Sequence, residues 1–566
     1  MVTMDAGPAL PAAQAKAPAV RAKGRGPAWA GWWRRAFGSS RRSMGTAGRP
    51  SAGRTAVLVL AEAVIAIGLA IGFLAWSLTI DVNPMIRRGQ VSGLAQLQFR
   101  LALCVLVLVV GLVVAQRLLR GRHRHVLVAI GCAAVAGLAT GLVGGGIAVA
   151  LRGTRYGLWV ADGDYGWILY WVNKMAAHQP VPNYYPPLYL DLLRILSSWS
   201  GQPPVYVVKP VQLVGTALFG PAAYLAWRLV LRPGWALGIG LVAAFPFIEP
   251  VKPYTQVTLV VLMPVLIALL RRIRRADTAS LAGVAWCGVR YGAALGVLFL
   301  LYSGWFVWGA LGVLVAFVVL APWRRAAGRV VLLSGSAVAV FLALTWRYVR
   351  GLVDPSGGIN DPYFYFDTDT DPAYFGMWRN DRPGAIVASL WPPPAEWAGV
   401  GLFTIALAVG LGAALWLGWR RTPVVVVGLF AASAWFLRMY LAGQAYATGT
   451  VRLYPRTTMV LLYCTLILAG FAVKYAVEAV LARTRRVATG PGTDVVGRFA
   501  PAGIPVGLAL IPLVFLFASA GSNWVDRYLP GAPNSYGSYA TEAQNTPQLD
   551  GHCPRYATQC TPTRPG

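Results

Sequence analysis

The sequence predicts an all-α protein that crosses a membrane many times, and three observations lead to this prediction. Hydrophobic residues make up 57% of the 566 residues and charged residues only 12%, a balance that a soluble chain of this length could not cover with polar surface. Apolar runs long enough to cross about 30 Å of hydrocarbon recur along the chain. These runs are continuous rather than alternating, and in lipid a long apolar run pairs its own backbone polar groups only as a helix.

We expect about 13 transmembrane helices in one domain over residues 56–520. The fifth and sixth runs are short and contain Pro246 and Pro264, so a broken or re-entrant path is expected there. The expected spans are 56–80, 98–116, 126–151, 205–231, 235–248, 257–270, 279–302, 305–322, 329–346, 398–419, 424–441, 457–482 and 501–520.

The distribution of charge predicts the orientation. With a cytoplasmic N-terminus, the basic clusters RLLRGRHR (117–124), RRIRR (271–275), WRR (323–325), RR (420–421) and RTRR (483–486) all fall in cytoplasmic loops. Most of the 20 acidic residues then fall on the opposite side. The sequence therefore predicts a multi-pass plasma-membrane protein with an extracytoplasmic C-terminus.

The two ends of the chain are polar. Residues 1–55 are rich in Ala, Gly, Pro and Arg and have no short apolar segment with a cleavage site, so we expect a disordered basic cytoplasmic arm that contacts anionic membrane lipid. Residues 521–566 should form a short extracytoplasmic tail, where a disulfide between Cys553 and Cys560 is expected. The net charge of +30 lies in short clusters between apolar runs, and no nucleic-acid-binding module is evident, so no nucleic-acid partner is predicted.

Two long loops are predicted on the extracytoplasmic side, at about 152–204 and 347–397. Both are rich in aromatic residues, proline and acids, as in NYYPPLY (183–189) and DPYFYFDTDTDPAYFGMW (361–378). Aromatic rings cover the C–H faces of sugars and carboxylates bind their hydroxyls, so the pattern favours a carbohydrate site at the outer face of the membrane. The alternative is a structural lid with solvated acids.

Asp162 and Asp164 follow the third expected span directly. A carboxylate at this depth is costly unless it is solvated or paired, and it could act as a general base toward an acceptor hydroxyl. A lipid-phosphate leaving group would need cations at headgroup depth, for which the sequence offers Lys209, Lys252, Arg452 and Arg456. The alternatives are an exposed Asp-Gly turn for the acids and ordinary snorkelling to the headgroups for the bases.

Metal binding is not predicted as a main feature. Asp367, Asp369 and Asp371 are spaced so that they could hold a hard cation such as Ca²⁺, but the Gly and distal Glu of an EF-hand loop are absent. The chain has only 4 histidines and no cluster of them. No cofactor is expected with certainty, and a divalent cation stays open.

The segment YGLWVADGDYGWILYWVNKMAAHQPVPNYYPPLYLDLLRILSSWSGQPPVYVVKPVQLV resembles the corresponding loop of AftA-type arabinofuranosyltransferases of mycobacteria and corynebacteria. Further likenesses are IEPVKPYTQVTLVVLMP, LYSGWFVWG and VRLYPRTTMVLLY. Those enzymes are GT-C membrane glycosyltransferases that move arabinofuranose from decaprenylphosphoryl-arabinose onto cell-wall galactan. The resemblance is patchy over residues 56–525 and implies a GT-C-like helix bundle, a polyprenyl-phosphate sugar donor and a cell-envelope glycan acceptor.

Carried over to this sequence, the resemblance implies roles for individual residues. Asp162 would be the catalytic base, while Asp164, which has no clear counterpart in the family, is added from its chemistry as an auxiliary. Lys209 and Arg452 match basic positions of the family and, with Lys252 and Arg456, would contact the donor phosphate. Glu249, Tyr185, Tyr254 and Trp305 would bind substrate.

One departure from the family weakens these expectations. The family continues into a sizeable soluble external domain, whereas here only a short tail follows the last expected span. The alternatives are therefore a non-catalytic homologue in cell-envelope assembly, or a transporter or flippase of lipid-linked glycan. A transporter should carry several polar residues deep in its spans, and Glu62 is the clear intramembrane acid here.

Overall fold

The computed structural model describes residues 52–120, 123–160, 163–353, 396–397, 400–449, 452–488, 505–532 and 535–563. Four predicted site residues, Asp162, Asp367, Asp369 and Asp371, lie outside the described residues, as do most of the predicted basic arm and most of the predicted loop at 347–397.

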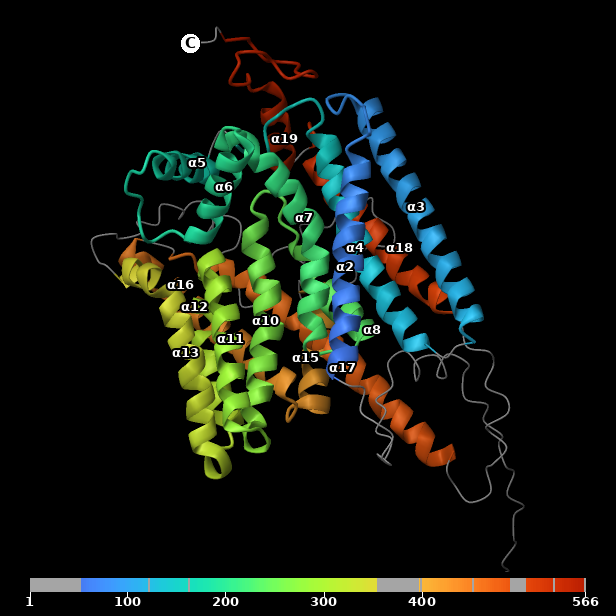
Figure 1. The fold of residues 1–566 in the computed structure, drawn as a ribbon, viewed down its shortest axis with the longest axis vertical. Helices are drawn as coiled ribbons and strands as arrows, with labels where there is room; N and C mark the ends of the chain where they lie inside the picture. The colour runs from blue at the N-terminus through green and yellow to red at the C-terminus, as the bar shows by residue number, and fades with distance from the viewer. Residues whose placement is uncertain are drawn as a thin grey trace, which may run out of the picture.

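The described chain is a helical bundle, and ten of its helices are long and apolar enough to cross a membrane (Figure 1). Together they show the fold of a multi-pass membrane protein, as predicted. The ten are α2 (Ala52–Ser77), α3 (Arg87–Leu118), α4 (Arg124–Ala150), α7 (Pro204–Arg228), α10 (Pro253–Arg274), α11 (Leu281–Leu301), α13 (Trp323–Val353), α16 (Thr422–Thr448), α17 (Thr457–Ala488) and α18 (Val506–Tyr528).

Three further apolar helical segments, of 10–17 residues, coincide with the remaining expected spans. They are Pro233–Phe247, α12 (Gly304–Leu320) and α15 (Leu402–Gly418). A straight helix of this length is about 25 Å long at most. The expected number of about 13 crossings is therefore matched by position, while the crossing of the short segments stays a prediction.

The two short runs that contain proline behave differently. Pro233–Phe247 changes helix type along its length, through α8 (Pro233–Trp235), the π-helix η1 (Ala236–Leu241), α9 (Val242–Ala244) and the 3₁₀ turn η2 (Phe245–Phe247). The break expected at Pro264 is wrong, because Pro264 lies inside the continuous helix α10. Most of α10 is buried against α7, α11, α12 and α16, and this packing offsets the hydrogen bond that proline removes.

Helix α4 is the centre of one half of the bundle and packs against α2, α3, α7 and α18. Its middle is almost entirely Gly, Ala and small apolar residues, all buried. A Cβ at Gly137 would collide with the backbone oxygen of Ala66 on α2. The small residues therefore allow the backbones of neighbouring helices to approach closely, as is common in membrane helix pairs.

Several smaller elements gather at one end of the bundle, which we call the α19 end (Figure 1). They include α5 (Gly163–Ala176), α6 (Pro187–Ser200) and α19 (Ser535–Asn545). Elsewhere the chain forms the 3₁₀ turns η3 (Ala276–Thr278) and η6 (Tyr454–Arg456), and a short antiparallel pairing of β1 (Glu396–Trp397) with β2 (Val400–Gly401).

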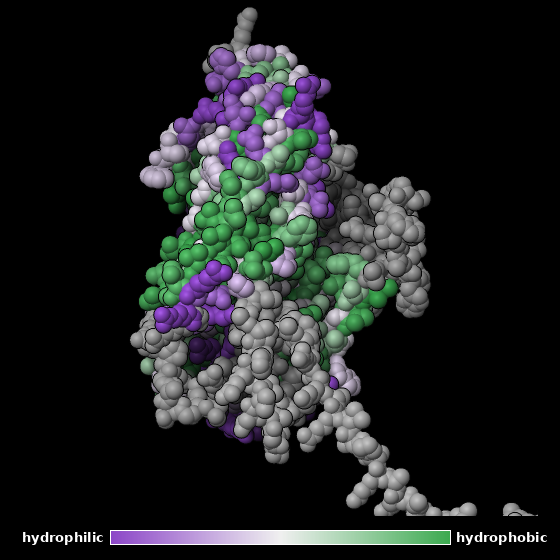
Figure 2. All heavy atoms as spheres, turned by 90° about the vertical axis from the view of Figure 1, so that its right-hand side faces the viewer, coloured by the Kyte–Doolittle hydropathy of each residue, from purple (hydrophilic) through white to green (hydrophobic). Residues whose placement is uncertain are grey.

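Figure 2 shows one face of the molecule, with hydrophobic side chains in a band across its middle and hydrophilic side chains gathered above, at the α19 end. Such a band is expected where lipid covers the helices. A large group of the hydrophilic side chains on this face therefore lies at the α19 end.

Candidate functional site

Two chain segments meet at the α19 end, and Gln212 of α7 joins them. One connects α4 to α5 (151–162), and the other precedes α10 (248–252). Gln212 is fully buried; its Nε2 donates to the carbonyl oxygens of Leu158 and Val251, both at 3.0 Å, and its Oε1 accepts from the Leu158 N–H at 2.7 Å. One side-chain amide in an apolar span thus forms hydrogen bonds with backbone groups of both loops, and these bonds fix the spacing of the loops.

Asp164 and Lys252, two of the predicted site residues, form an ion pair across this junction. Asp164 lies in the first turn of α5, where the helix dipole favours an acid. Lys252 precedes α10, and its ammonium also lies 5.2 Å from the centre of the Trp159 ring. The two side chains are 30% and 21% exposed, so the pair is held in place but reachable from solvent.

A network of tyrosines lies beside this pair and includes the predicted residues Tyr185 and Tyr254. Their hydroxyls are 2.8 Å apart. Tyr165 donates its only hydroxyl proton to the carbonyl oxygen of Val251, so the 2.7 Å bond between Tyr165 and Tyr189 must be donated by Tyr189. The ring of Tyr189 stacks on that of Tyr254 at 3.9 Å. Burial raises the pKa of Tyr185, so these hydroxyls act as neutral hydrogen-bonding groups.

Arg456 and Trp305 approach the network from another side. The Nη1 of Arg456 donates to the hydroxyl of Tyr302 at 2.5 Å, and the ring of Tyr302 lies 6.3 Å from that of Tyr254. Trp305 is buried, and its indole N–H donates to the carbonyl oxygen of Thr255, so it stabilises the backbone next to Tyr254. In the described part of the chain, the exposed Arg452 makes no hydrogen bond to this network.

Lys209 is placed differently from the other predicted bases. Its ammonium donates to the carbonyl oxygens of Leu151 at 2.8 Å and Thr154 at 2.6 Å, at the C-terminal end of α4. The Leu151 carbonyl is among those that the end of α4 leaves without helical partners, and the Thr154 carbonyl lies in the connection that follows. Lys209 therefore holds the start of the α4–α5 connection and leaves one ammonium proton for other contacts.

An apolar cavity of about 610 Å³ lies next to the tyrosine network. It is enclosed by α6, α7, α10 and the end of α11, and the rings of Tyr189 and Tyr254 form part of its wall. Its other contributors are mostly aliphatic, including Leu192, Val211 and Val257. The apolar groove and the tyrosine network thus share two residues, Tyr189 and Tyr254.

Glu249 lies on the same pre-α10 segment as Lys252. Its Oε1 accepts the Val251 N–H at 3.2 Å, and the side chain is partly exposed. Burial raises the pKa of this carboxyl, while the Lys252 ammonium acts in the opposite direction.

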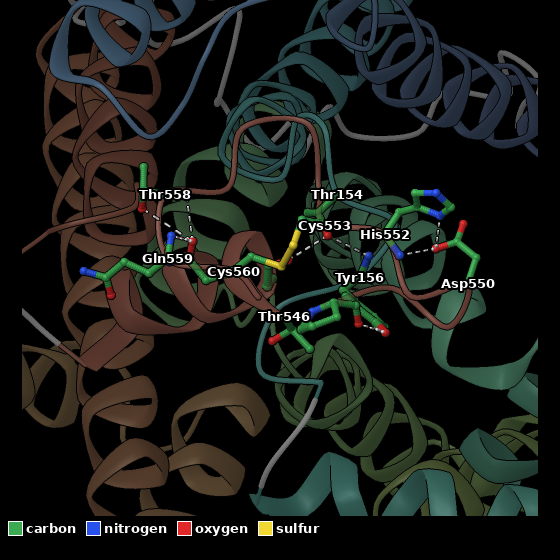
Figure 3. The surroundings of a disulfide bond; sticks show 12 residues. Thr154, Tyr156, Thr546, Asp550, His552, Cys553, Thr558, Gln559 and Cys560 are labelled. Carbon is green, nitrogen blue, oxygen red and sulfur yellow. Dashed lines mark hydrogen bonds and ion pairs between the residues drawn. A yellow bond between two sulfur atoms is a disulfide. The ribbon is translucent and has the colours of Figure 1, made fainter. Parts of the chain in front are cut away.

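The C-terminal segment covers the junction and contains the disulfide expected from the sequence, Cys553–Cys560 (Figure 3). Thr154 donates to the carbonyl oxygen of Ala543 at 2.7 Å, and Tyr156 donates to that of Pro547 at 2.8 Å. The tail therefore fixes the α4–α5 connection from the solvent side.

Sequence reasoning missed several residues of this junction. Gln212 could have been noticed as a lone amide in an apolar span, and Tyr189 as part of the YPPLY motif. Nothing in the sequence indicated that Trp159 or Tyr165 would lie beside Lys252 and Val251.

The part of the chain that the structure describes contains no group of three or more His, Cys, Asp or Glu side chains that could hold a metal ion. Comparison of the sequence with models of known protein families and with curated proteins finds no match.

Proposed function

We propose that this protein is a GT-C-like membrane glycosyltransferase that moves a pentose, arabinofuranose by the family resemblance, from a polyprenyl-phosphate donor to a cell-envelope glycan. In this proposal it lies in the plasma membrane with the α19 end extracytoplasmic. The observation that carries the proposal is the apolar groove that ends on Tyr189 and Tyr254, directly beside the Asp164–Lys252 pair.

A polyprenyl-phosphate sugar has an apolar tail, an anionic phosphate and a polar sugar. The groove between α6, α7 and α10 suits the tail, because its lining is almost entirely apolar. Lys252 and Arg456 suit the phosphate, since both are cations near Tyr254, which lines the groove: Lys252 lies two residues before it, and Arg456 bonds to Tyr302, whose ring is 6.3 Å from that of Tyr254. The hydroxyls of the tyrosine network, which lie between the groove and the ion pair in this proposal, suit the sugar.

The ion pair suggests how such a donor would prepare the site. While Lys252 is paired with Asp164, each neutralises the other. A donor phosphate would compete for the Lys252 ammonium, and the Asp164 carboxylate, once separated from Lys252, could accept a proton. The acceptor oxygen bonds to the anomeric carbon, the bond from that carbon to the phosphate oxygen breaks, and the acceptor proton passes to Asp162 or Asp164. The polyprenyl phosphate leaves with the additional negative charge, which Lys252 and Arg456 stabilise.

The proposal is tested with purified protein, decaprenylphosphoryl-arabinose and a galactan oligosaccharide. We expect release of decaprenyl phosphate and loss of this activity in Asp162→Asn and Lys252→Gln. Lys474→Gln is the matched control, because Lys474 also pairs with an acid, Glu478 at 2.6 Å, but far from the site on α17. No transfer by the unmodified protein with any lipid-linked pentose would contradict the proposal and favour a transporter, flippase or non-catalytic homologue.

The orientation has its own test. A cysteine at Ser538, which is exposed on α19, should react with an impermeant maleimide in intact cells, whereas a cysteine at the exposed Arg324 should react only after permeabilisation. Gly163 is a poor choice for such a cysteine, because its φ is +59° and a Cβ there would collide with the Trp159 ring.

A further inference from the structure

A continuous row of aromatic side chains leads from α18 to the ion pair. We call Tyr528, Tyr536, Tyr539 and Trp159 the aromatic wall. The ring centres of Tyr528 and Tyr536 are 5.2 Å apart, those of Tyr536 and Tyr539 are 6.2 Å apart, and Tyr539 stacks on Trp159 at 5.1 Å. Because Lys252 lies over the other end of this row at Trp159, the wall reaches the Asp164–Lys252 pair.

Carboxylates act on this wall from three positions, those of Glu249, Glu542 and Asp164. Burial raises the pKa of Tyr536, and the Glu249 charge adds to the effect. The pKa of Tyr539 is also raised by burial, with further contributions from Tyr536, Glu249, Glu542 and Asp164. Tyr539 therefore lies within the electrostatic reach of a carboxylate that pairs with Lys252 and of a second carboxylate, Glu249, that does not.

The wall also holds a polar group with an unused hydrogen bond. The Tyr528 side chain is fully buried, and its hydroxyl has no hydrogen-bond partner among the described residues. A buried hydroxyl without a partner costs about 1–3 kcal/mol, so such a group in a native fold calls for a ligand or a bound water. Tyr528 belongs to the same row of rings as Tyr536.

The wall is separate from the apolar groove, since none of its four residues contributes to the groove lining. Trp159, Tyr536 and Tyr539 are each partly exposed, as is Glu249. Flat rings, neutral hydroxyls and a carboxylate are the groups that bind uncharged sugars: rings pack on C–H faces and the carboxylate accepts hydroxyl protons. An apolar tail would give the Glu249 carboxylate no hydrogen bond beyond the one from the Val251 N–H, and an anionic ligand would be repelled by it.

We propose that the aromatic wall and Glu249 form the binding site of the acceptor, a neutral polyhydroxylated oligosaccharide that reaches the Asp164–Lys252 pair from the side of α19. This inference rests on the proposed function, because it assigns the second of the two substrates. It gives the C-terminal segment a role in recognition, and it places donor and acceptor on opposite sides of one ion pair.

Binding is measured without turnover, using a panel of neutral pentose and hexose tetrasaccharides and, separately, decaprenyl phosphate. We expect Tyr539→Ala and Glu249→Gln to weaken oligosaccharide binding by about tenfold or more, the loss of one good contact. Both variants should bind decaprenyl phosphate as the unmodified protein does. Tyr539→Phe, which keeps the ring, should retain most of the affinity, and it also reveals whether Tyr539→Ala acts merely by loosening α19.

Tyr556→Ala is the control, because Tyr556 is a tail tyrosine that contacts Asp81 rather than the wall. Failure of the unmodified protein to bind any neutral tetrasaccharide would overturn the inference. So would oligosaccharide affinities of Glu249→Gln and Tyr539→Ala that equal the affinity of the unmodified protein. If oligosaccharide binds at the wall but no sugar is transferred, the proposed function fails and this site stands. If transfer occurs while both variants keep the acceptor KM, the site fails and the proposed function stands.

Discussion

Two acid–base pairs in this protein are built in contrasting ways. Glu62 of α2 and Arg228 of α7 make two hydrogen bonds, at 2.6 and 2.9 Å, and Tyr224 donates to the same carboxylate at 2.8 Å. Glu62 is 0% exposed and Arg228 only 13%. The Asp164–Lys252 pair at the α19 end is 30% and 21% exposed.

The difference indicates what each pair can do. A buried, doubly bonded pair has no room to exchange partners, and breaking it leaves an uncompensated charge in a low-dielectric interior. A partly exposed ion pair gains little stability from the attraction between its two charges, and one partner can be exchanged for an incoming ion. The Glu62–Arg228 pair holds α2 to α7. In our proposal the Asp164–Lys252 pair binds the donor phosphate and accepts the proton.

The largest expected effect comes from breaking the buried pair. Glu62→Gln should lower the free energy of unfolding by about 3–5 kcal/mol, because Arg228 would stay buried without a counter-charge. Thermal unfolding of the detergent-solubilised protein measures this. An unchanged melting temperature together with lost sugar transfer would instead assign the buried pair to function.

Breaking the exposed pair should affect activity rather than folding. Asp164→Asn should slow transfer by about 100-fold if Asp164 is the base, and far less if Asp162 is. The free energy of unfolding should change by about 1 kcal/mol or less. Single-turnover kinetics measured together with thermal unfolding separates the two effects. An Asp164→Asn protein that is strongly destabilised but still transfers sugar at the normal rate would contradict the contrast between the two pairs.

The loops that carry the exposed pair depend on Gln212. Replacing it with leucine leaves the carbonyl and the N–H of Leu158 without the partners that Gln212 provides, at a cost of about 1–3 kcal/mol, while the carbonyl of Val251 keeps only the hydrogen bond from Tyr165. Hydrogen exchange should then become faster in 155–160 and 248–252 but not in the middle of α4. Equal protection from hydrogen exchange in the unmodified protein and in Gln212→Leu would show that the two loops keep their spacing without this amide.

The smallest effect is expected where the tail meets Asp81. Hydrogen bonds from Arg152 and Tyr556 hold the pKa of this carboxyl below its ordinary value of 3.8. The contribution of Asp81 to tail attachment is therefore complete above that pH and is lost as the pH falls through the lowered pKa. Proteolysis of residues 552–563 should increase in Asp81→Asn at neutral pH, and acid should add little further in that variant.

Local patterns predicted the membrane fold well, because an apolar run reports on a helix without reference to any other segment. The spans that became α2, α4 and α17 needed no tertiary information. The break expected at Pro264 was wrong because the packing around α10, which no local pattern contains, offsets the missing hydrogen bond.

The site was predicted less completely, because its parts are far apart in the sequence. Asp164, Lys252, Tyr185 and Tyr254 were named for their chemistry, and the structure brings them together. Lys209 was named on the same grounds, yet it binds the end of α4. The sequence contains no signal that tells a cation bound to carbonyls from one beside a carboxylate.

The central claim is that Lys252 exchanges Asp164 for a lipid phosphate, and it predicts effects of opposite sign. Decaprenyl phosphate should bind more weakly to Lys252→Gln, because a cation is lost, and more tightly to Asp164→Asn, because a competitor for that cation is lost. The control Lys474→Gln should bind it unchanged. Unchanged or weaker binding by Asp164→Asn would contradict the exchange.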